Sequence, residues 1–378
     1  MPIWKKGIPI SPNSPSSRNM MNERLWLKAG KALFTLEEIK LKSPPEIMGP
    51  GLEVVEFCHQ WLNGRTTFEF STSGSTGPPK KISFFREQLT ASAKLTEVSL
   101  KLLPGYTALI CLDIHFIAGA MMLVRSLVTG MNMIIVPPSS DPLKGITDAI
   151  DFAAFVPFQL PAMIQQEPEQ LNAIKKIIIG GAPLDESLVG RLQGHPGNVY
   201  STYGMTETLT HVALRKVNGP DRQKYFQLLP GIRASLDERG CLIIHADHLG
   251  DPLITNDRVT LLGLDRFQWE GRIDRLINSG GIKVQAEKIE KIVEEIFADL
   301  KLSNRFFISG IPDPQLSEKV VLIVEGHISH SLEEQISGML KKRLSRFELP
   351  RRFFLVDRFM ETESQKIDRQ STLKQLLK

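Results

Sequence analysis

A run of hydroxyl, glycine and lysine side chains at residues 71–81 is the part of this sequence best suited to carry chemistry. It reads Ser-Thr-Ser-Gly-Ser-Thr-Gly-Pro-Pro-Lys-Lys and follows residues 66–70, whose alternating phenylalanines predict a half-buried strand. Glycines let a turn bring backbone N–H groups close to an anion, hydroxyls donate further hydrogen bonds, and a lysine adds positive charge. The residues predicted to hold phosphate are Ser71, Thr72, Ser73, Gly74, Ser75, Thr76, Gly77 and Lys80.

Two other structures could account for this run. Composition alone also permits a Ser/Gly surface turn. A Walker A loop is disfavoured, because that motif needs Gly-Lys-Ser/Thr leading into a helix, whereas here Pro78 and Pro79 precede the lysine and an apolar run at 82–85 follows it.

A second segment could receive the base of a nucleotide. Gly180, Gly181, Ala182 and Pro183 follow a buried run at 177–179. A strand that ends in two glycines at the carboxyl edge of a parallel sheet leaves bare backbone, against which a flat ring such as adenine can lie. Taken by itself, this fragment also fits a tight strand-to-helix turn.

A third segment, residues 201–207, offers an aromatic ring and a carboxylate. Tyr203 and Gly204 could lie against adenine, with the tyrosine ring stacked on it. Thr206 could donate a hydrogen bond to the α-phosphate, and Glu207 is a hard carboxylate suited to Mg²⁺. A single such residue in a turn ordinarily has a structural role. The order of the three segments along the chain therefore decides between a structural and a functional interpretation.

In that order, the segments resemble the adenylate-forming superfamily of acyl- and aryl-CoA ligases, peptide-synthetase adenylation domains and luciferases. Residues 71–80 match the loop that clamps the β- and γ-phosphates of ATP in that family, and residues 203–207 match its Tyr-Gly-x-Thr-Glu motif. The resemblance extends from residue 71 to residue 369. Most members of the family carry a longer segment before the phosphate loop.

The resemblance implies roles for residues further along the chain. Asp257, in a segment where Asn256 replaces the family's glycine, would accept both ribose hydroxyls, and Arg272 would also reach the ribose. Asp274 would be the hinge between two domains. The loop containing Gly280 and Gly281 would let the pantetheine arm of coenzyme A approach closely.

The resemblance also places a catalytic lysine near the end of the chain. Residues 362–369 are similar to the family's C-terminal catalytic segment, and Lys366 falls on its lysine. Met360 and Gln365 stand where the family has proline and glycine. Without the resemblance, a solvated lysine would be the simpler interpretation.

Two segments, residues 115–125 and 204–215, narrow the resemblance to the compact o-succinylbenzoate-CoA ligases of menaquinone synthesis. His115 would lie near the acyl pocket, and Arg125, His211 and Arg215 are candidate partners for a second substrate carboxylate. Ordinary packing or surface ion pairing are the alternatives for these four side chains.

The elements that must position these residues follow from hydrophobic periodicity. Short apolar runs alternate with helix-length segments, which predicts an α/β fold with a parallel sheet covered on both faces. The predicted strands are residues 108–112, 133–136, 153–156, 177–179 and 199–201, and the helices are residues 24–31, 52–62, 86–103, 117–128 and 184–192. A small β-rich subdomain is expected at residues 242–270.

The last hundred residues predict a separate α+β unit. It has a helix at 286–300, strands at 306–309, 320–324 and 352–356, and a second helix opened by a capping box at Ser331. We therefore expect an N-terminal ATP- and acid-binding domain at residues 1–273 and a small mobile C-terminal domain at residues 274–378.

Composition and charge bound the class of protein. The chain has 378 residues, of which 42% are hydrophobic, enough for a large core. Its cysteines, Cys58, Cys111 and Cys241, are far apart, which favours a reduced compartment. No run of about 18 apolar residues and no signal-peptide pattern occurs, so a cytoplasmic protein without membrane insertion is expected. The net charge of +4 comes with no recognisable nucleic-acid module. The sequence leaves a homodimer open.

The sequence therefore predicts an enzyme that uses ATP, Mg²⁺ and coenzyme A to convert a small carboxylic acid, such as o-succinylbenzoate, into an acyl-adenylate and then a thioester. A ligase for another aryl or acyl acid and an enzyme that loads a carrier protein are alternatives. A nucleotide-binding module without catalysis is the alternative outside the enzymes.

Overall fold

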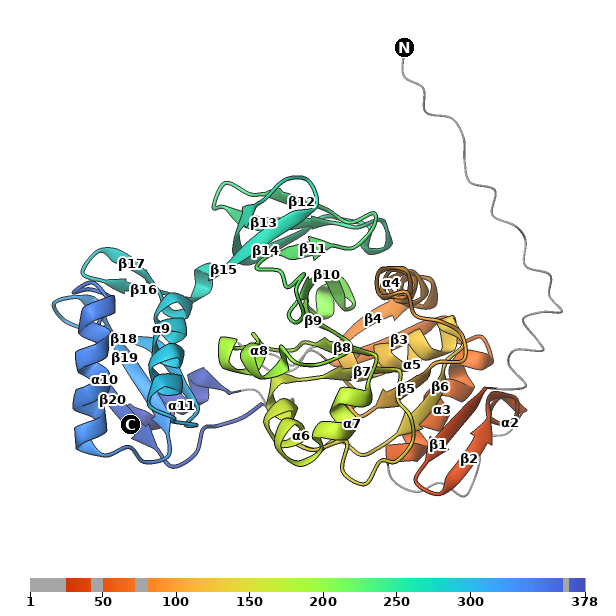
Figure 1. Cartoon of the computed structure of the whole chain (residues 1–378). Coiled ribbons are helices and arrows are strands. Elements are labelled where there is room, and N and C mark those ends of the chain that lie inside the picture. Colours follow the sequence, from red (N-terminus) through yellow and green to blue (C-terminus); the bar gives the residue numbers. More distant parts are fainter. Residues whose placement is uncertain (1–24, 42–49, 72–80, 363–366, 378) are drawn as a thin grey trace, which may run out of the picture.

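The computed structural model describes residues 25–41, 50–71, 81–362 and 367–377 (Figure 1). Eight of the predicted site residues lie outside these ranges, and their predicted roles stay predictions. They are Thr72, Ser73, Gly74, Ser75, Thr76, Gly77, Lys80 and Lys366.

Six parallel strands form one half of a 13-stranded sheet. Their order is β9-β8-β7-β5-β6-β1, and β2 (Ala32–Thr35) closes this edge antiparallel to β1. The strands are β1 (Trp26–Ala29), β5 (Thr107–Ile110), β6 (Asn132–Ile135), β7 (Phe152–Phe155), β8 (Lys176–Ile179) and β9 (Asn198–Gly204).

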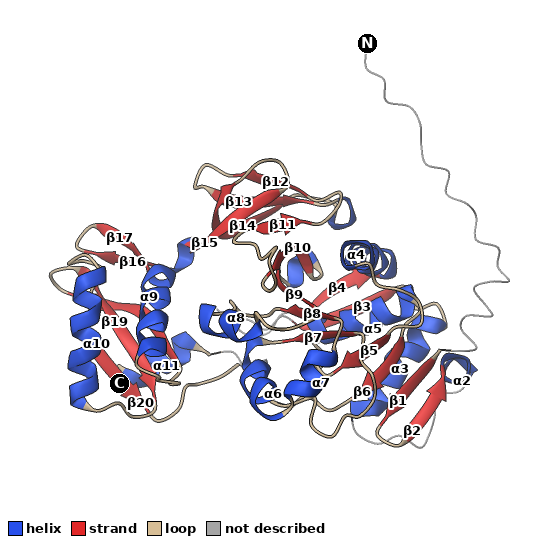
Figure 2. Cartoon of the chain, in the orientation of Figure 1, coloured by secondary structure: helices blue, strands red, loops and turns tan. Residues whose placement is uncertain are grey.

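Helices cover both faces of this parallel half (Figure 2). Successive residues of one strand enter different cores: Ala108 and Ile110 of β5 pack in one hydrophobic cluster, and Leu109 packs in the other. The predicted sheet, buried on both faces, is confirmed. The helices are α2 (Leu36–Leu41), α3 (Pro50–Leu62), α4 (Arg86–Leu100), α5 (Ile117–Thr129), α6 (Leu160–Gln166), α7 (Pro168–Ala173) and α8 (Glu186–Leu192).

The predicted β-rich part continues the same sheet with antiparallel strands. Beyond β9, the order is β10-β11-β15-β14-β13-β12. These strands are β10 (His211–Lys216), β11 (Phe226–Leu228), β12 (Arg233–Leu236), β13 (Cys241–His245), β14 (Leu253–Leu261) and β15 (Arg266–Arg272). A separate hairpin, β3 (Thr67–Ser71) and β4 (Lys81–Phe85), brackets the predicted phosphate loop.

The C-terminal residues form a second sheet of five strands. A 3-10 turn, η4 (Ile273–Arg275), leads from β15 of the large sheet to β16 of the small one. The elements are β16 (Leu276–Ser279), β17 (Ile282–Gln285), α9 (Ala286–Asp299), β18 (Phe306–Asp313), β19 (Ser317–Glu325), α10 (His330–Arg343), β20 (Arg352–Val356) and α11 (Arg369–Leu376). None of the helices in the described part of the chain has the length and hydropathy needed to cross a bilayer.

Two predictions about local structure were wrong. Residues 24–31, expected to be helical, contain β1, because Leu27 is fully buried and pairs with Met133 of β6. Long-range pairing here overrides the helix propensity of a Leu- and Lys-rich segment. The N-cap of α10 is Ser329, whose hydroxyl accepts a hydrogen bond from the N–H of Leu332 at 3.3 Å, and Ser331 lies in the first turn.

Candidate active site

The Gly-Gly turn lies at the carboxyl end of β8. Gly181 has φ +85°, a conformation that favours glycine, and a Cβ atom on Gly180 would stand 2.3 Å from Oγ1 of Thr202 on β9. Gly181, Ala182 and Pro183 are exposed. This strip of open backbone at the sheet edge has the geometry that a flat base requires.

The Thr-Glu pair begins the turn that follows β9. Gly204 packs so tightly that a Cβ atom there would lie 2.2 Å from the carbonyl oxygen of Thr210, so the turn folds back directly onto β10. Thr206 is half-buried and Glu207 is exposed. Within the described residues, no hydrogen bond or ion pair engages the Glu207 carboxylate, and a carboxylate is a ligand type that Mg²⁺ prefers.

Asp257 is held by two aromatic donors. Tyr203 donates its hydroxyl hydrogen to Oδ2 over 2.9 Å, and the indole N–H of Trp269 donates to Oδ1 over 3.0 Å. Asp257 is only 5% exposed, yet each carboxylate oxygen can accept a further hydrogen bond. These contacts orient the carboxylate that was predicted to receive the ribose. Sequence reasoning missed Trp269, whose only signal was an indole on a strand that ends at Arg272.

Tyr203 is 9% exposed as a residue, and its ring packs edge-on against Phe267, with ring centroids 5.0 Å apart. Burial, and secondarily the neighbouring Asp257 carboxylate, raise the pKa of Tyr203 well above its usual range, so the hydroxyl stays protonated and remains a donor. Little of the ring is available for the predicted stacking on adenine in this structure. Its most direct contact with the site is the hydrogen bond to Asp257.

Arg272 joins the predicted ribose site to the predicted hinge. Its guanidinium pairs with both oxygens of Asp274, with Nε–Oδ1 and Nη2–Oδ2 distances of 2.9 and 2.5 Å, and its Nη1 lies 3.8 Å from Asp257. Asn256 also reaches Asp274, at 3.5 Å. Asp274 therefore lies in the turn between the two sheets with its carboxylate anchored to the large sheet.

Gly280 and Gly281 form the two-residue loop of the β16–β17 hairpin. Their φ angles of +62° and +82° are those of a type I′ turn, which requires positive φ at both central residues. This turn geometry accounts for the paired glycines without any ligand. Their predicted contact with coenzyme A stays a prediction.

Of the four candidate partners for an acid substrate, the structure brings two together. Arg125 on α5 is 1% exposed and donates from Nε to Oγ1 of Thr96 at 3.2 Å and from Nη2 to Oγ1 of Thr210 at 2.7 Å. Nε2 of His211 lies 3.2 Å from the same Thr96 oxygen. No carboxylate among the described residues pairs with Arg125.

Burial dominates the ionisation of this cluster. It lowers the pKa of Arg125 to about 9, and burial together with the nearby Arg125 charge lowers the pKa of His211 well below its usual value. His211 is therefore neutral at neutral pH, and Arg125 is the cation of the cluster. Among the described residues, the hydrogen-bond partners of Arg125 are the hydroxyls of Thr96 and Thr210, so this buried cation has no anionic partner there.

His115 and Arg215 lie apart from this cluster. His115 is exposed and bonded to Asp113 at 2.8 Å, a contact that raises its pKa. Its carbonyl accepts the N–H of Ser71 at 3.3 Å, which places it at the base of the predicted phosphate loop. Arg215 stacks over Phe226 at 5.4 Å.

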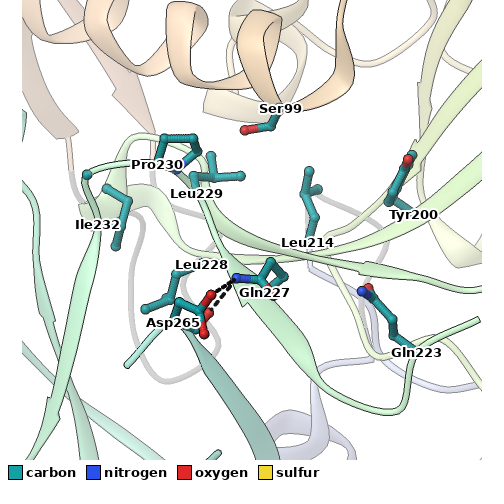
Figure 3. Close-up of a pocket in the computed structure, with 11 residues that line it drawn as sticks. Ser99, Tyr200, Leu214, Gln223, Gln227, Leu228, Leu229, Pro230, Ile232 and Asp265 are labelled. Atoms are coloured by element: carbon teal, nitrogen blue, oxygen red, sulfur yellow. Dashed lines mark hydrogen bonds between the residues drawn. The ribbon is translucent and has the colours of Figure 1, made fainter. Parts of the chain in front are cut away.

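A cavity of about 490 Å³ lies between the end of α4 and strands β9, β10 and β11 (Figure 3). Its lining is mainly apolar, with a hydrogen bond of 2.8 Å between Gln227 and Asp265 at one side. None of the predicted site residues that the structure describes lines it. It is therefore separate from the described part of the candidate active site.

The fold and the site together define an α/β nucleotide-binding protein with an appended α+β unit. Residues 68–243 match the AMP-binding enzyme family model. A solved acyl-CoA synthetase (AMP-forming)/AMP-acid ligase II-like protein from Dyadobacter fermentans is 37% identical, with 90% of this chain and 98% of that chain covered and a TM-score of 0.60. The chain belongs to this AMP-binding, adenylate-forming family, which confirms the resemblance inferred from its motifs.

Two curated relatives are more distant. The 4-chlorobenzoate–CoA ligase of Arthrobacter is 25% identical over 82% of this chain and 66% of its own length. The 2-succinylbenzoate–CoA ligase of Salmonella typhimurium is 24% identical over 82% of this chain and 69% of its own length. The chain thus spans about two thirds of the length of these relatives.

Proposed function

We propose that the protein is an AMP-forming acid–thiol ligase. The substrate carboxylate attacks the α-phosphorus of ATP, pyrophosphate leaves, and the thiol of coenzyme A then displaces AMP from the acyl-adenylate. One observation supports this proposal: three of the predicted nucleotide-binding segments, those containing Gly180, Tyr203 and Asp257, lie together at the end of β9. Thr202 touches Gly180, Tyr203 bonds Asp257, and Gly204 leads into the Thr206–Glu207 turn.

Each part of the site has a role in the first step. Asp257 and Arg272 hold the ribose, the loop at 71–80 holds the leaving pyrophosphate, and Lys366 stabilises the charge that develops at the α-phosphate. Thr206 donates a hydrogen bond to that phosphate. Bound to Glu207, Mg²⁺ would offset negative charge on the phosphate oxygens.

The second step requires the C-terminal unit to change its orientation. We propose that residues 274–378 rotate about Asp274, so that Lys366 withdraws and the Gly280–Gly281 turn approaches the site to contact coenzyme A. The position of Asp274 in the η4 turn supports this division of the chain.

For the acid, we propose a substrate with a second negative group, and o-succinylbenzoate as the first compound to test. The support is the buried Arg125, which lacks a carboxylate partner among the described residues and could pair with the distal carboxylate. The two curated relatives differ in this respect, because 4-chlorobenzoate has one carboxylate and 2-succinylbenzoate has two. The Arg125 cluster therefore favours the dicarboxylate. His115 and Arg215 are kept as further candidates for contact with the acid.

A coupled assay tests this function. The protein is incubated with ATP, Mg²⁺, coenzyme A and either o-succinylbenzoate or 4-chlorobenzoate, and thioesters are detected by mass. We expect the succinylbenzoyl thioester to form faster. Arg125→Lys should lower kcat/KM for the dicarboxylate about tenfold or more and leave turnover of the monocarboxylate nearly unchanged, because the bidentate pairing of the guanidinium with a second carboxylate is lost only with the former. Nucleotide binding without pyrophosphate release, for any acid, would contradict the ligase and favour a binding module.

A further inference from the structure

A partly buried ion-pair cluster joins three distant parts of the C-terminal unit. Glu290 on α9 accepts hydrogen bonds from Nη2 of Arg275 on both carboxylate oxygens, each at 2.8 Å. Oε1 also accepts from Nη1 of Arg369 at 2.6 Å and from the N–H of Ile308 at 2.9 Å. Arg275 pairs in addition with Glu287, at 2.8 Å. The Glu290 side chain is only 17% exposed.

The electrostatics show that Glu290 belongs to this cluster as an anion. Burial opposes its ionisation, but the guanidinium groups of Arg369 and Arg275 more than offset that effect and hold its pKa below the usual value. Charge-assisted hydrogen bonds of this kind fix geometry more firmly than neutral ones. Loss of the carboxylate would leave the two guanidinium groups close together with less compensation.

The two arginines lie close in sequence to the predicted hinge and to the predicted catalytic lysine. Arg275 ends η4, directly after the predicted hinge residue Asp274. Arg369 begins α11, three positions after Lys366. Ile367 forms a β-bridge with Glu361, and Nη1 of Arg305 donates to Glu361 at 2.6 Å, so the described residues before and after Lys366 in the sequence, Glu361 and Ile367, are held together.

We propose that Glu290 is a positioning residue for adenylate formation. Because it pairs with both Arg275 and Arg369, Glu290 fixes the orientation of the start of α11 relative to η4, the turn about which we propose that the C-terminal unit rotates. The start of α11 follows Lys366 closely in the sequence. Lys366 then moves together with the C-terminal unit when that unit rotates. This inference rests on the proposed function, since it concerns the lysine assigned to the first step.

The test separates the two half-reactions. Acid-dependent exchange of pyrophosphate into ATP reports adenylate formation, and thioester formation from a supplied acyl-adenylate and coenzyme A reports the second step, for which Lys366 is withdrawn. Glu290→Gln should lower kcat of the exchange about 10- to 100-fold, with KM for ATP and the thioester rate within about twofold of the wild type. Arg369→Lys, which keeps the charge but loses the guanidinium geometry, should act in the same direction.

The control is Glu295→Gln on the same helix, an exposed side chain that pairs with Arg343 at 3.0 Å. It should change neither half-reaction. Equal losses in both half-reactions for Glu290→Gln and Arg369→Lys would show general damage and overturn the inference, as would no loss in either. Should Glu290→Gln fail to fold, Arg369→Lys decides by the same criteria. Exchange in the wild type and its loss in Lys366→Ala are measured first, and their absence would instead overturn the proposed function.

Discussion

Tyr203 donates its hydroxyl hydrogen to Asp257 across 2.9 Å, although 54 positions separate the two residues in the sequence. One was predicted to contact the adenine and the other the ribose of the same nucleotide. The bond ties the end of β9 to β14 and sets the direction in which the Asp257 carboxylate faces.

Removing this hydroxyl should weaken nucleotide binding. In Tyr203→Phe, Asp257 keeps the Trp269 donor but loses one of its two fixed hydrogen bonds, so we expect about a fivefold rise in the Kd for AMP, or ~1 kcal/mol. Isothermal titration measures the affinity. Tyr225→Phe, beneath Arg266 at 5.3 Å, is the matched control. An unchanged Kd in Tyr203→Phe would mean that the bond does not prepare Asp257 for the ligand.

The carboxylates between α8 and α9 should make stability depend on pH. Burial, and then the charges of Asp185 and Glu186, raise the pKa of Glu294 from 4.5 to about 8. The folded state therefore binds more protons than the unfolded state between these values, and stability should fall as pH rises from about 4.5 to 8. Glu294→Gln removes the group and should raise the melting temperature at pH 8 while leaving it nearly unchanged at pH 5.

Thermal melts at both pH values, with the exposed Glu169→Gln on α7 as control, measure this effect. A gain for Glu294→Gln that is the same at pH 5 and pH 8 would indicate better packing of the amide, and would contradict the electrostatic explanation.

The cysteines should be inert in the folded protein. All three are buried and free, and burial raises the pKa of Cys58 and of Cys111 to about 12, while burial also raises that of Cys241. Because the thiolate is the reactive form, a thiol reagent at pH 8 should label none of them within minutes. After unfolding in urea, all three should react. Rapid labelling of one native cysteine would reveal local opening at that residue.

The two glycines of the β16–β17 turn should respond differently to alanine. A methyl group on Gly281 would enter open space, so its cost is the positive φ alone, about 1 kcal/mol. A methyl group on Gly280 would lie 2.8 Å from the Phe347 ring, so Gly280→Ala should cost more. Urea unfolding measures both costs.

Gly281→Ala also tests the proposed contact with coenzyme A. If the pantetheine arm passes this turn, the variant should raise KM for coenzyme A in the thioester step and leave pyrophosphate exchange unaltered. An unchanged KM would leave the turn with a purely conformational reason for its glycines.

Hydrophobic patterns within single segments predicted the parallel strands, because each of these strands is a short apolar run flanked by helix-length segments. The strands from β5 to β9 are short apolar runs, and each was placed from residue type and flanking segments alone. The antiparallel strands were expected as a separate subdomain, but they extend the parallel sheet through the pairing of β10 with β9. Such pairing joins residues far apart in the sequence, and periodicity within one segment does not report it.

In the candidate site, too, sequence motifs identified some residues, whereas others could be found only from contacts between distant segments. Arg125 and His211 were singled out by motif, and the structure places both against Thr96. Trp269 was missed because its role depends on the register between β14 and β15, which brings its indole N–H to Asp257. The Glu290 cluster was missed for a similar reason, since three elements must pack before its partners meet.

The three residues of η4 form the one covalent crossing between the two sheets. Four peptide steps from Arg272 to Leu276 reach at most roughly 14 Å, so the smaller unit is kept on a short tether. The rotation proposed above is therefore limited to a pivot over the larger unit and does not involve release and return by diffusion. A few glycines inserted after Asp274 would lengthen that tether, and the change in the rates of the two proposed half-reactions would then measure how much they depend on its shortness.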